Sequence, residues 1–106
     1  MKTKRAKATD ISQKVKKAVW ERDGGRCVVC GNAHNVMPNA HFIPRSKGGL
    51  GVEQNIVTLC QECHYRFDQT SERLSIYAYI MNYLQGKYFN WNIDKLIYKK
   101  GENYDK

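Results

Sequence analysis

Cys27-Val-Val-Cys30 and Cys60-Gln-Glu-Cys63 are the two stretches that decide how this chain of 106 residues folds. Each Cys-x-x-Cys turn can present two thiolates to one ion, and four thiolates complete a tetrahedral zinc site. A disulfide framework is the alternative, because the same cysteines can also pair with one another. A cytoplasmic chain keeps its thiols reduced, which favours the metal. The spacing therefore predicts a structural Zn²⁺ held by all four cysteines.

Length and composition indicate one small folded domain. Apolar residues make up 42% of the chain and charged residues 26%, which is ordinary for a globular protein. A core of this size is modest and benefits from a metal staple. No continuous apolar segment follows the basic first residues, so we expect no secretory signal and a cytoplasmic location. The densest apolar stretch, residues 74–84, is too short and too polar to span a bilayer, so we expect no membrane partner.

The chain is strongly basic, with 18 Lys and Arg against 10 Asp and Glu and a net charge of +8. This balance fits a polyanionic partner, above all a nucleic acid that is bound through its phosphates. The alternative is a soluble protein with a solvated basic face, and charge by itself does not decide between them.

The order of patterns along the chain predicts a helix, two short strands and further helices. Residues 1–8 are expected to form a flexible basic arm, and residues 9–106 a single domain. Thr9 or Asp10 can cap a first helix that ends at Gly24-Gly25.

Strands are expected at 39–43 and 56–59, with a glycine-rich loop at 45–51 between them. A helix should begin near Gln61 and carry His64 and Asp68. Another helix, from about Ser71 to Gln85, is apolar on nearly all sides, with Leu74 and Leu84 on one face, so we expect it to be well covered. The aromatic-rich segment 88–98 should fold back on the domain.

His41, Asn55 and His64 follow one another inside the cysteine framework, within Ala-His-Phe-Ile-Pro-Arg-Ser-Lys-Gly-Gly and Asn-Ile-Val-Thr-Leu-Cys-Gln-Glu-Cys-His. In this order they closely resemble the HNH endonuclease family, and more narrowly its small zinc-stapled members in bacteriophages and prophages. The motif covers roughly residues 27–68, and we place the domain core at 27–70. The resemblance implies an α+β fold: a ββα-metal (His-Me finger) core with a four-cysteine zinc site and flanking helices.

The same resemblance implies a metal-dependent DNA endonuclease that hydrolyses phosphodiester bonds, by nicking or by double-strand cleavage. His41 matches the family's general base, a task that suits an imidazole because its ordinary pKa is near neutrality. His64 matches a ligand of the catalytic divalent ion, and Asn55 matches the residue that braces the loop between the strands. Mg²⁺ or Mn²⁺ is the expected ion, with Ni²⁺ or Zn²⁺ as alternatives.

Ala40 departs from the family pattern, because many members carry a second metal ligand just before the base. Asp68 is the expected substitute, since it lies four residues after His64 and so on the same helix face. Its alternative roles are to cap the following turn or to pair with Arg66 or Arg73.

Arg45 and Lys47 lie in the glycine-rich loop after His41, where they are placed to contact DNA phosphates, unless they are simply solvated loop charges. DNA is the expected partner, and the resemblance adds the phage DNA-packaging terminase. We expect a monomer or weak dimer, located in the host cytoplasm if the chain is phage-encoded.

A non-catalytic, zinc-stapled nucleic-acid-binding module is the alternative function, and a zinc-stapled protein-interaction domain is a third. Neither requires His41, Asn55 and His64, so these three residues favour the nuclease. Each histidine also has a structural alternative. His41 can be a satisfied core histidine, and His64 can replace one cysteine in a zinc site of three cysteines and one histidine.

Overall fold

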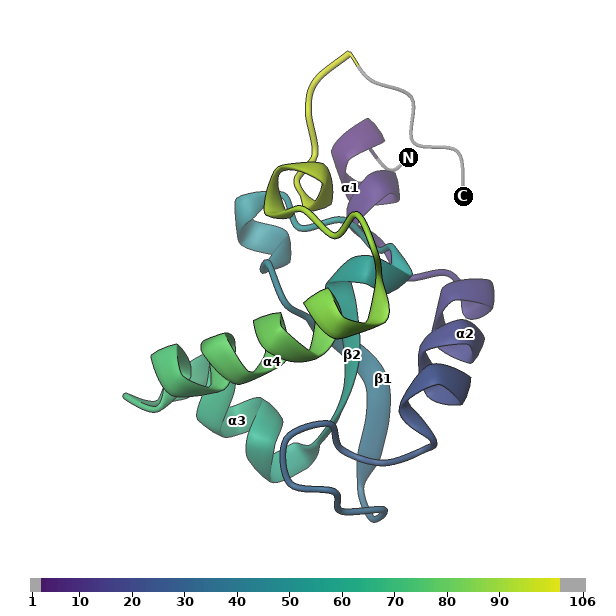
Figure 1. The fold of residues 1–106 in the computed structure, drawn as a ribbon. Helices are drawn as coiled ribbons and strands as arrows, with labels where there is room; N and C mark the ends of the chain where they lie inside the picture. The colour runs from purple at the N-terminus through teal and green to yellow at the C-terminus, as the bar shows by residue number, and fades with distance from the viewer. Residues whose placement is uncertain (1–2, 102–106) are drawn as a thin grey trace.

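The computed structural model describes residues 3–101, in which helices surround one two-stranded antiparallel sheet (Figure 1). Strand β1 spans Val36–His41 and strand β2 spans Ile56–Cys60. Ala40 pairs with Val57, and the register shifts between Met37 and Ala40. All residues of β2 are buried, so this strand is the centre of the core.

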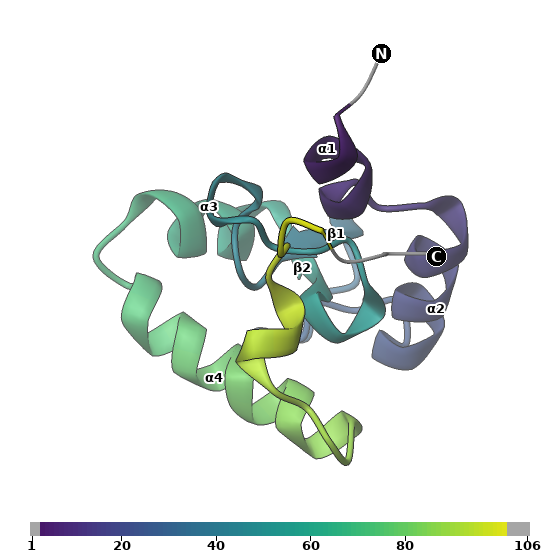
Figure 2. The ribbon, with the colours of Figure 1, turned by 90° about the horizontal axis from the view of Figure 1, so that it is seen from above.

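Four helices and three short 3-10 turns complete the described chain. They are α1 (Lys4–Thr9), α2 (Gln13–Asp23), η1 (Arg45–Lys47), η2 (Glu53–Asn55), α3 (Gln61–Gln69), α4 (Arg73–Lys87) and η3 (Ile93–Leu96). Figures 1 and 2 show α2 on one side of the β1–β2 hairpin and α3 with α4 on the other. The predicted α+β class is confirmed, and β1, β2 and α3 form the expected ββα unit.

The N-terminal region differs from the expected flexible arm. Residues 4–9 form helix α1, in which the Thr3 hydroxyl accepts a hydrogen bond from the Ala6 amide at 3.0 Å. Helix α2 is capped by Ser12, which accepts from the Val15 amide at 3.2 Å, so the expected cap at Thr9 or Asp10 is wrong. Residues 1–2 of the expected arm lie outside the described residues.

The hairpin differs from its prediction in its first strand only. Strand β1 begins at Val36 and ends at His41, whereas we expected residues 39–43. It ends there because the Ile43 amide donates to the Asn55 side chain, at 2.8 Å, instead of to a neighbouring strand. The second strand and the helix beginning at Gln61 are confirmed.

Helix α4 buries Ile76, Ile80 and Leu84 against the core. The expectation that this helix is covered on both faces is wrong, because Leu74 is 80% exposed. Segment 88–98 does fold back, and Trp91 packs edge-on against Phe42 with ring centroids 5.6 Å apart. Within residues 3–101, no helix is both long enough and apolar enough to cross a membrane.

Two side chains at the end of α2, Arg22 and Asp23, form an ion pair and join this helix to β2 through hydrogen bonds. The Asp23 side chain has no exposed surface, and it accepts hydrogen bonds from Arg22 at 2.8 Å, from the Thr58 amide at 2.8 Å and from the Tyr83 hydroxyl at 2.5 Å. Arg22 also donates to the Ile56 carbonyl at 2.7 Å. Burial and the hydrogen bond to Asp23 raise the pKa of Tyr83 to about 12. These contacts fix the position of β2, which lies between Asn55 and helix α3.

Candidate functional site

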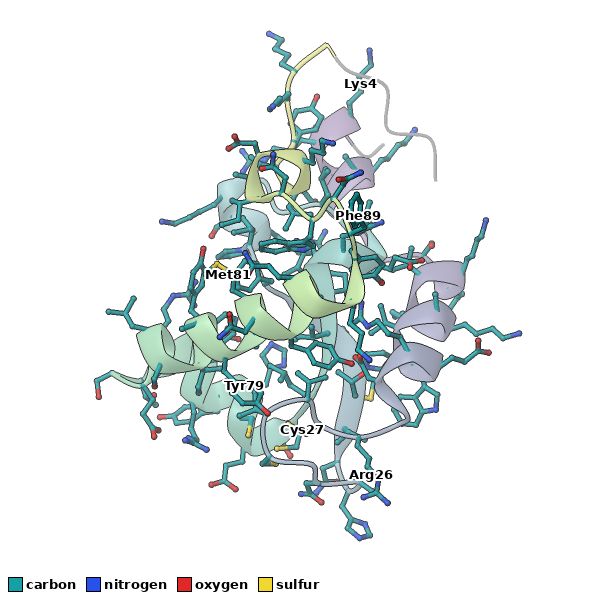
Figure 3. All side chains as sticks on the ribbon, in the orientation of Figure 1. Lys4, Arg26, Cys27, Tyr79, Met81 and Phe89 are labelled. Carbon is teal, nitrogen blue, oxygen red and sulfur yellow. The ribbon has the colours of Figure 1, made fainter. Side chains whose placement is uncertain are left out.

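The four predicted zinc ligands converge at the start of α3. Cys27, which Figure 3 labels, and Cys30 come from the loop after α2. Cys60 ends β2, and Cys63 lies in the first turn of α3. Their sulfur atoms all lie within 4.8 Å of one another, and those of Cys30 and Cys60 are 3.7 Å apart. Four sulfurs around one tetrahedral zinc ion, each about 2.3 Å from it, are separated by about 3.8 Å. The spacing therefore fits a single metal ion such as zinc.

Backbone geometry shapes this cluster. Gly31 has a φ of +79°, as the tight turn after Cys30 requires, and its amide donates to the Cys27 carbonyl at 2.9 Å. The Cys63 amide donates to the Cys60 sulfur at 3.3 Å, so Cys60 also caps α3. Both turns thus form locally and present their sulfurs to the same point.

The pKa values of the thiols also favour a bound cation. Burial raises the pKa of Cys27, but backbone N–H groups, including that of Cys30, donate to its sulfur, and the net pKa is about 7. Burial and the neighbouring sulfurs of Cys60 and Cys30 raise the pKa of Cys63. Four negative charges cannot gather here without a compensating ion. A divalent metal supplies that charge, and the donor set is the one that zinc prefers.

His41 lies at the end of β1, where its side chain meets the N-terminal segment. Its Nε2 atom is 2.8 Å from the Thr9 carbonyl oxygen. A carbonyl oxygen can only accept a hydrogen bond, so Nε2 carries the proton in this contact. When the ring is neutral, Nδ1 is then the nitrogen that can accept a proton, as a general base requires.

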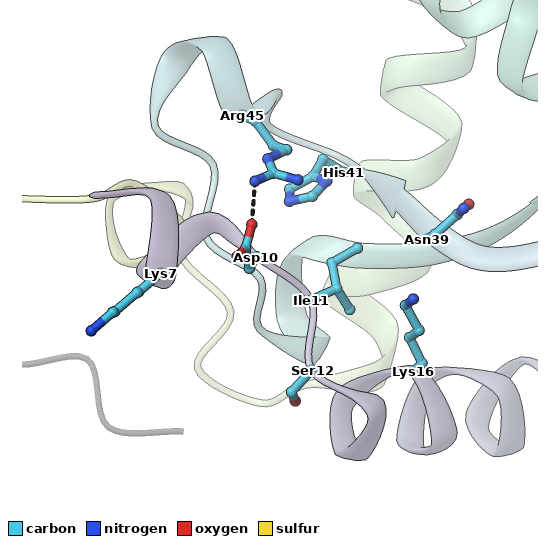
Figure 4. Close-up of a pocket in the computed structure, with 8 residues that line it drawn as sticks. All are labelled: Lys7, Asp10, Ile11, Ser12, Lys16, Asn39, His41 and Arg45. Carbon is cyan, nitrogen blue, oxygen red and sulfur yellow. Dashed lines mark hydrogen bonds and ion pairs between the residues drawn. The ribbon is translucent and has the colours of Figure 1, made fainter. Parts of the chain in front are cut away.

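His41 and Arg45 line an open cleft of about 630 Å³ (Figure 4). Its residues come from α1, α2, the linker between them, β1 and η1, and they are Lys7, Asp10, Ile11, Ser12, Lys16, Asn39, His41 and Arg45. Arg45 forms an ion pair with Asp10 across the cleft. Lys47, Asn55, His64 and Asp68 are not among the residues that line it.

Asn55 lies fully buried beneath the loop that follows His41. Its side-chain oxygen accepts from the Ile43 amide at 2.8 Å, and its nitrogen donates to the carbonyls of Ile43 and Leu50 at 3.2 and 2.9 Å. Gly49 passes so close that a Cβ atom there would lie 1.6 Å from the Ile43 oxygen. Asn55 therefore holds both ends of the loop that carries Arg45.

Replacing Asn55 with alanine should destabilise the protein by about 3 kcal/mol, because it leaves the Ile43 amide and the Leu50 carbonyl buried without these partners. Urea unfolding of the zinc-loaded protein measures this cost. Gln54→Ala, at the neighbouring half-buried position, is the control and should change stability by no more than about 0.5 kcal/mol. Equal midpoints for the two variants would contradict the bracing role.

His64 and Asp68 lie one turn apart on α3, as expected. His64 Nε2 is 3.1 Å from Asp68 Oδ2, and the two side chains are 34% and 43% exposed. The other expected partners of Asp68 are engaged elsewhere, since Arg66 pairs with Glu72 at 2.8 Å and Arg73 donates to the Phe67 carbonyl at 3.1 Å.

The nitrogen of His64 and the oxygen of Asp68 are close enough to serve as two ligands of one divalent ion, with further positions left for water and phosphate. Ala40 is fully buried and contributes no ligand atom. Within residues 3–101, the cysteine cluster is the one group of three or more converging metal-ligating side chains, and His64 and Asp68 form a pair without a third such side chain beside them.

The sequence patterns do not predict that α1, α2 and the linker between them line the cleft. Lys16 is one of three lysines within four residues, with Lys14 and Lys17, and helical spacing alone does not show which of them faces His41. The sequence pattern assigns Asp10 to a helix cap. Its ion pair with Arg45 spans 35 residues of sequence, and no local pattern signals it.

A model of the HNH endonuclease family matches residues 27–76, which include the four cysteines, His41, Asn55, His64 and Asp68. The chain is also 30% identical, over 67 residues, to a protein named anaredoxin from Nostoc sp. (strain PCC 7120). That alignment covers 63% of this chain and 88% of the relative. With the ββα unit and the convergent cysteines described above, these matches show that the chain belongs to the HNH endonuclease family.

Proposed function

We propose that the protein is a metal-dependent endonuclease that hydrolyses phosphodiester bonds of DNA. The observation that carries the proposal is the placement of His41, whose Nε2 contacts the Thr9 carbonyl at 2.8 Å while its ring lines an open, basic cleft beside Arg45. Membership of the HNH family supports the same chemistry. The net charge of +8 supports a polyanionic substrate.

In this reaction, Nδ1 of His41 takes a proton from a water molecule as the water oxygen attacks the scissile phosphorus. The bond between phosphorus and the 3′ oxygen breaks, and the 3′ oxygen takes a proton from solvent. The products are a 5′-phosphate and a 3′-hydroxyl. Arg45, and Lys47 outside the cleft, hold phosphates of the substrate. His64 and Asp68 would hold a divalent cation, Mg²⁺ or Mn²⁺, which when bound offsets the negative charge that develops on the phosphate and the leaving oxygen.

The zinc ion that we assign to the four cysteines has a structural task. The four cysteine sulfurs would fill all four ligand positions of a tetrahedral zinc ion, so no position remains for water or substrate. The ion would join the loop after α2 to the end of β2 and the first turn of α3. It thereby supports β2, which pairs with the strand that carries His41, and α3, which carries His64.

We further propose that the chain is of phage or prophage type, active in the cytoplasm of the host cell, with residues 9–106 as its nuclease domain and residues 4–8 docked on that domain. The resemblance to small zinc-stapled nucleases supports this assignment, and it makes the packaging terminase a candidate partner. A non-catalytic nucleic-acid-binding module is the second candidate function. The buried Ala40 favours it, since the family's usual second metal ligand is missing there.

Incubating the zinc-loaded protein with supercoiled plasmid tests the proposal. We expect relaxed or linear DNA when Mg²⁺ or Mn²⁺ is added, and no conversion without an added divalent ion. Ni²⁺ and additional Zn²⁺ complete the metal series. Retarded migration of intact plasmid with every metal would favour the binding module over the nuclease.

A further inference from the structure

We propose that Lys7 and Lys16 bind phosphates of the DNA strand that enters the cleft, and that Asp10 occupies Arg45 in place of a phosphate until DNA binds. The N-terminal segment, residues 3–12, would then be a substrate-binding wall. This inference rests on the proposed function for the identity of the polyanion.

The N-terminal segment is seated firmly on the loop that follows His41. The Arg5 guanidinium donates to the carbonyls of Arg45 and Ser46 at 3.3 and 3.0 Å. The Gly51 amide donates to the Ala8 carbonyl at 3.0 Å. A Cβ atom at Gly51 would lie 1.9 Å from the Asp10 carbonyl oxygen, so the two backbones touch and only glycine leaves room. These contacts, with that of Thr9 to His41, fix the wall relative to the proposed base.

The wall brings basic side chains to the face that carries His41. Lys7 from α1, Lys16 from α2 and Arg45 from η1 line one cleft and outnumber its single carboxylate, that of Asp10. Figure 4 shows Arg45 beside His41 and Lys7 at the rim, with its ammonium group directed away from His41. Cations from three separate elements around one opening make a basic groove, which attracts a phosphate backbone. Such residues set the position of the strand and carry no sequence information.

Asp10 lies where a substrate phosphate would meet Arg45. Its carboxylate is paired with the guanidinium, and phosphate oxygens use the same donors in the same planar geometry. The Arg45 side chain is 53% exposed and that of Asp10 is 26% exposed. An ion pair this open to solvent contributes little to stability, so a backbone phosphate of DNA, which also carries one negative charge, can replace the carboxylate.

The test compares two double variants that carry the same charge. Lys7→Ala with Lys16→Ala removes the cleft lysines. Lys4→Ala with Lys17→Ala removes one lysine from each of the same helices, and neither of these lines the cleft; Lys4 points away from the body of the protein (Figure 3). Fluorescence anisotropy with a labelled DNA duplex, without divalent ions, gives the affinity from about 50 to 200 mM salt.

For two lost phosphate contacts, the slope of log affinity against log salt should fall by about 1.8. The ratio of the wild-type affinity to that of the Lys7/Lys16 variant should then fall about tenfold as the salt rises across this range. The Lys4/Lys17 variant should keep a slope close to that of the wild type. Equal slopes for the two double variants would overturn the assignment of the lysines.

Asp10→Asn tests the second half of the proposal, with Asp94→Asn in η3 as the control that removes the same charge outside the cleft. We expect the Asp10 variant to bind the duplex several-fold more tightly than the Asp94 variant, because Arg45 no longer holds a competing carboxylate. Equal or weaker binding would show that Asp10 serves only to fasten the N-terminal segment.

The experiment separates this inference from the proposed function. A wild-type protein that neither binds nor cuts DNA would remove both. A wild-type protein that binds and cuts DNA, with cleft and control variants that behave alike, would overturn the N-terminal wall and leave the nuclease intact.

Discussion

Replacing His41 with alanine is expected to lower the rate of plasmid nicking by about two to four orders of magnitude. The imidazole is the group placed to take the proton of the attacking water, and alanine offers no acceptor in its place. Its partner, the Thr9 carbonyl, sets which ring nitrogen is basic. Initial rates at saturating metal and DNA measure the loss, because the change should act on catalysis and leave DNA binding largely intact.

His34→Ala is the matched control for this prediction. His34 is an exposed loop histidine within the same cysteine framework, and it lies away from the cleft. Its replacement should leave the nicking rate within about twofold of the wild type, since surface substitutions have small effects. Both variants should keep their zinc, and His41→Ala should lower the thermal midpoint by no more than several degrees, the cost of about one hydrogen bond, that to the Thr9 carbonyl. Equal rates for the two variants would remove His41 as the base.

Removing zinc is expected to unfold the protein. A structural zinc site of this kind contributes about 10–16 kcal/mol of binding free energy at neutral pH, more than the net stability of most small domains. Here the ion would hold together four clustered thiolates, three of them buried, which cannot all be ionised without it. A chelator should therefore abolish the helical circular dichroism, and Cys63→Ser should give the same result without a chelator.

Chelator that has been saturated with zinc beforehand is the control, and it should leave the dichroism and the thermal midpoint unchanged. Acid should release the ion as well, because protons compete for the sulfurs. A chain that stays folded with no bound metal would contradict the structural zinc site.

The parts of the fold that the sequence predicts are those encoded by local signals. Each Cys-x-x-Cys pair lies in one turn, and their spacing is enough to predict that the four sulfurs meet. His64 and Asp68 are four residues apart on one helix, so their 3.1 Å contact follows from helical geometry. Asn55 was expected to brace the loop through the family resemblance, and its three hydrogen bonds supply the physical reason.

The parts that could not be predicted depend on contacts between distant segments. Basic composition before residue 9 is typical of a flexible arm, yet Arg5 and Ala8 find partners on the 45–51 loop and the segment becomes ordered. The same docking places Asp10 on Arg45 and completes the cleft. The exposure of Leu74 could not be predicted for a similar reason. When a helix is apolar on nearly all sides, the elements that pack against it decide which face is buried.

Cleavage of a DNA duplex in water enriched in oxygen-18 tests the central claim most directly. The wild-type protein, loaded with zinc and supplied with Mg²⁺ or Mn²⁺, should produce 5′-phosphates that carry one heavy oxygen from water, together with unlabelled 3′-hydroxyls. Mass spectrometry of the fragments reads both ends. Intact DNA with every divalent ion, or fragments whose 5′-phosphates lack the heavy oxygen, would contradict metal-dependent hydrolysis by attack of water on the phosphorus.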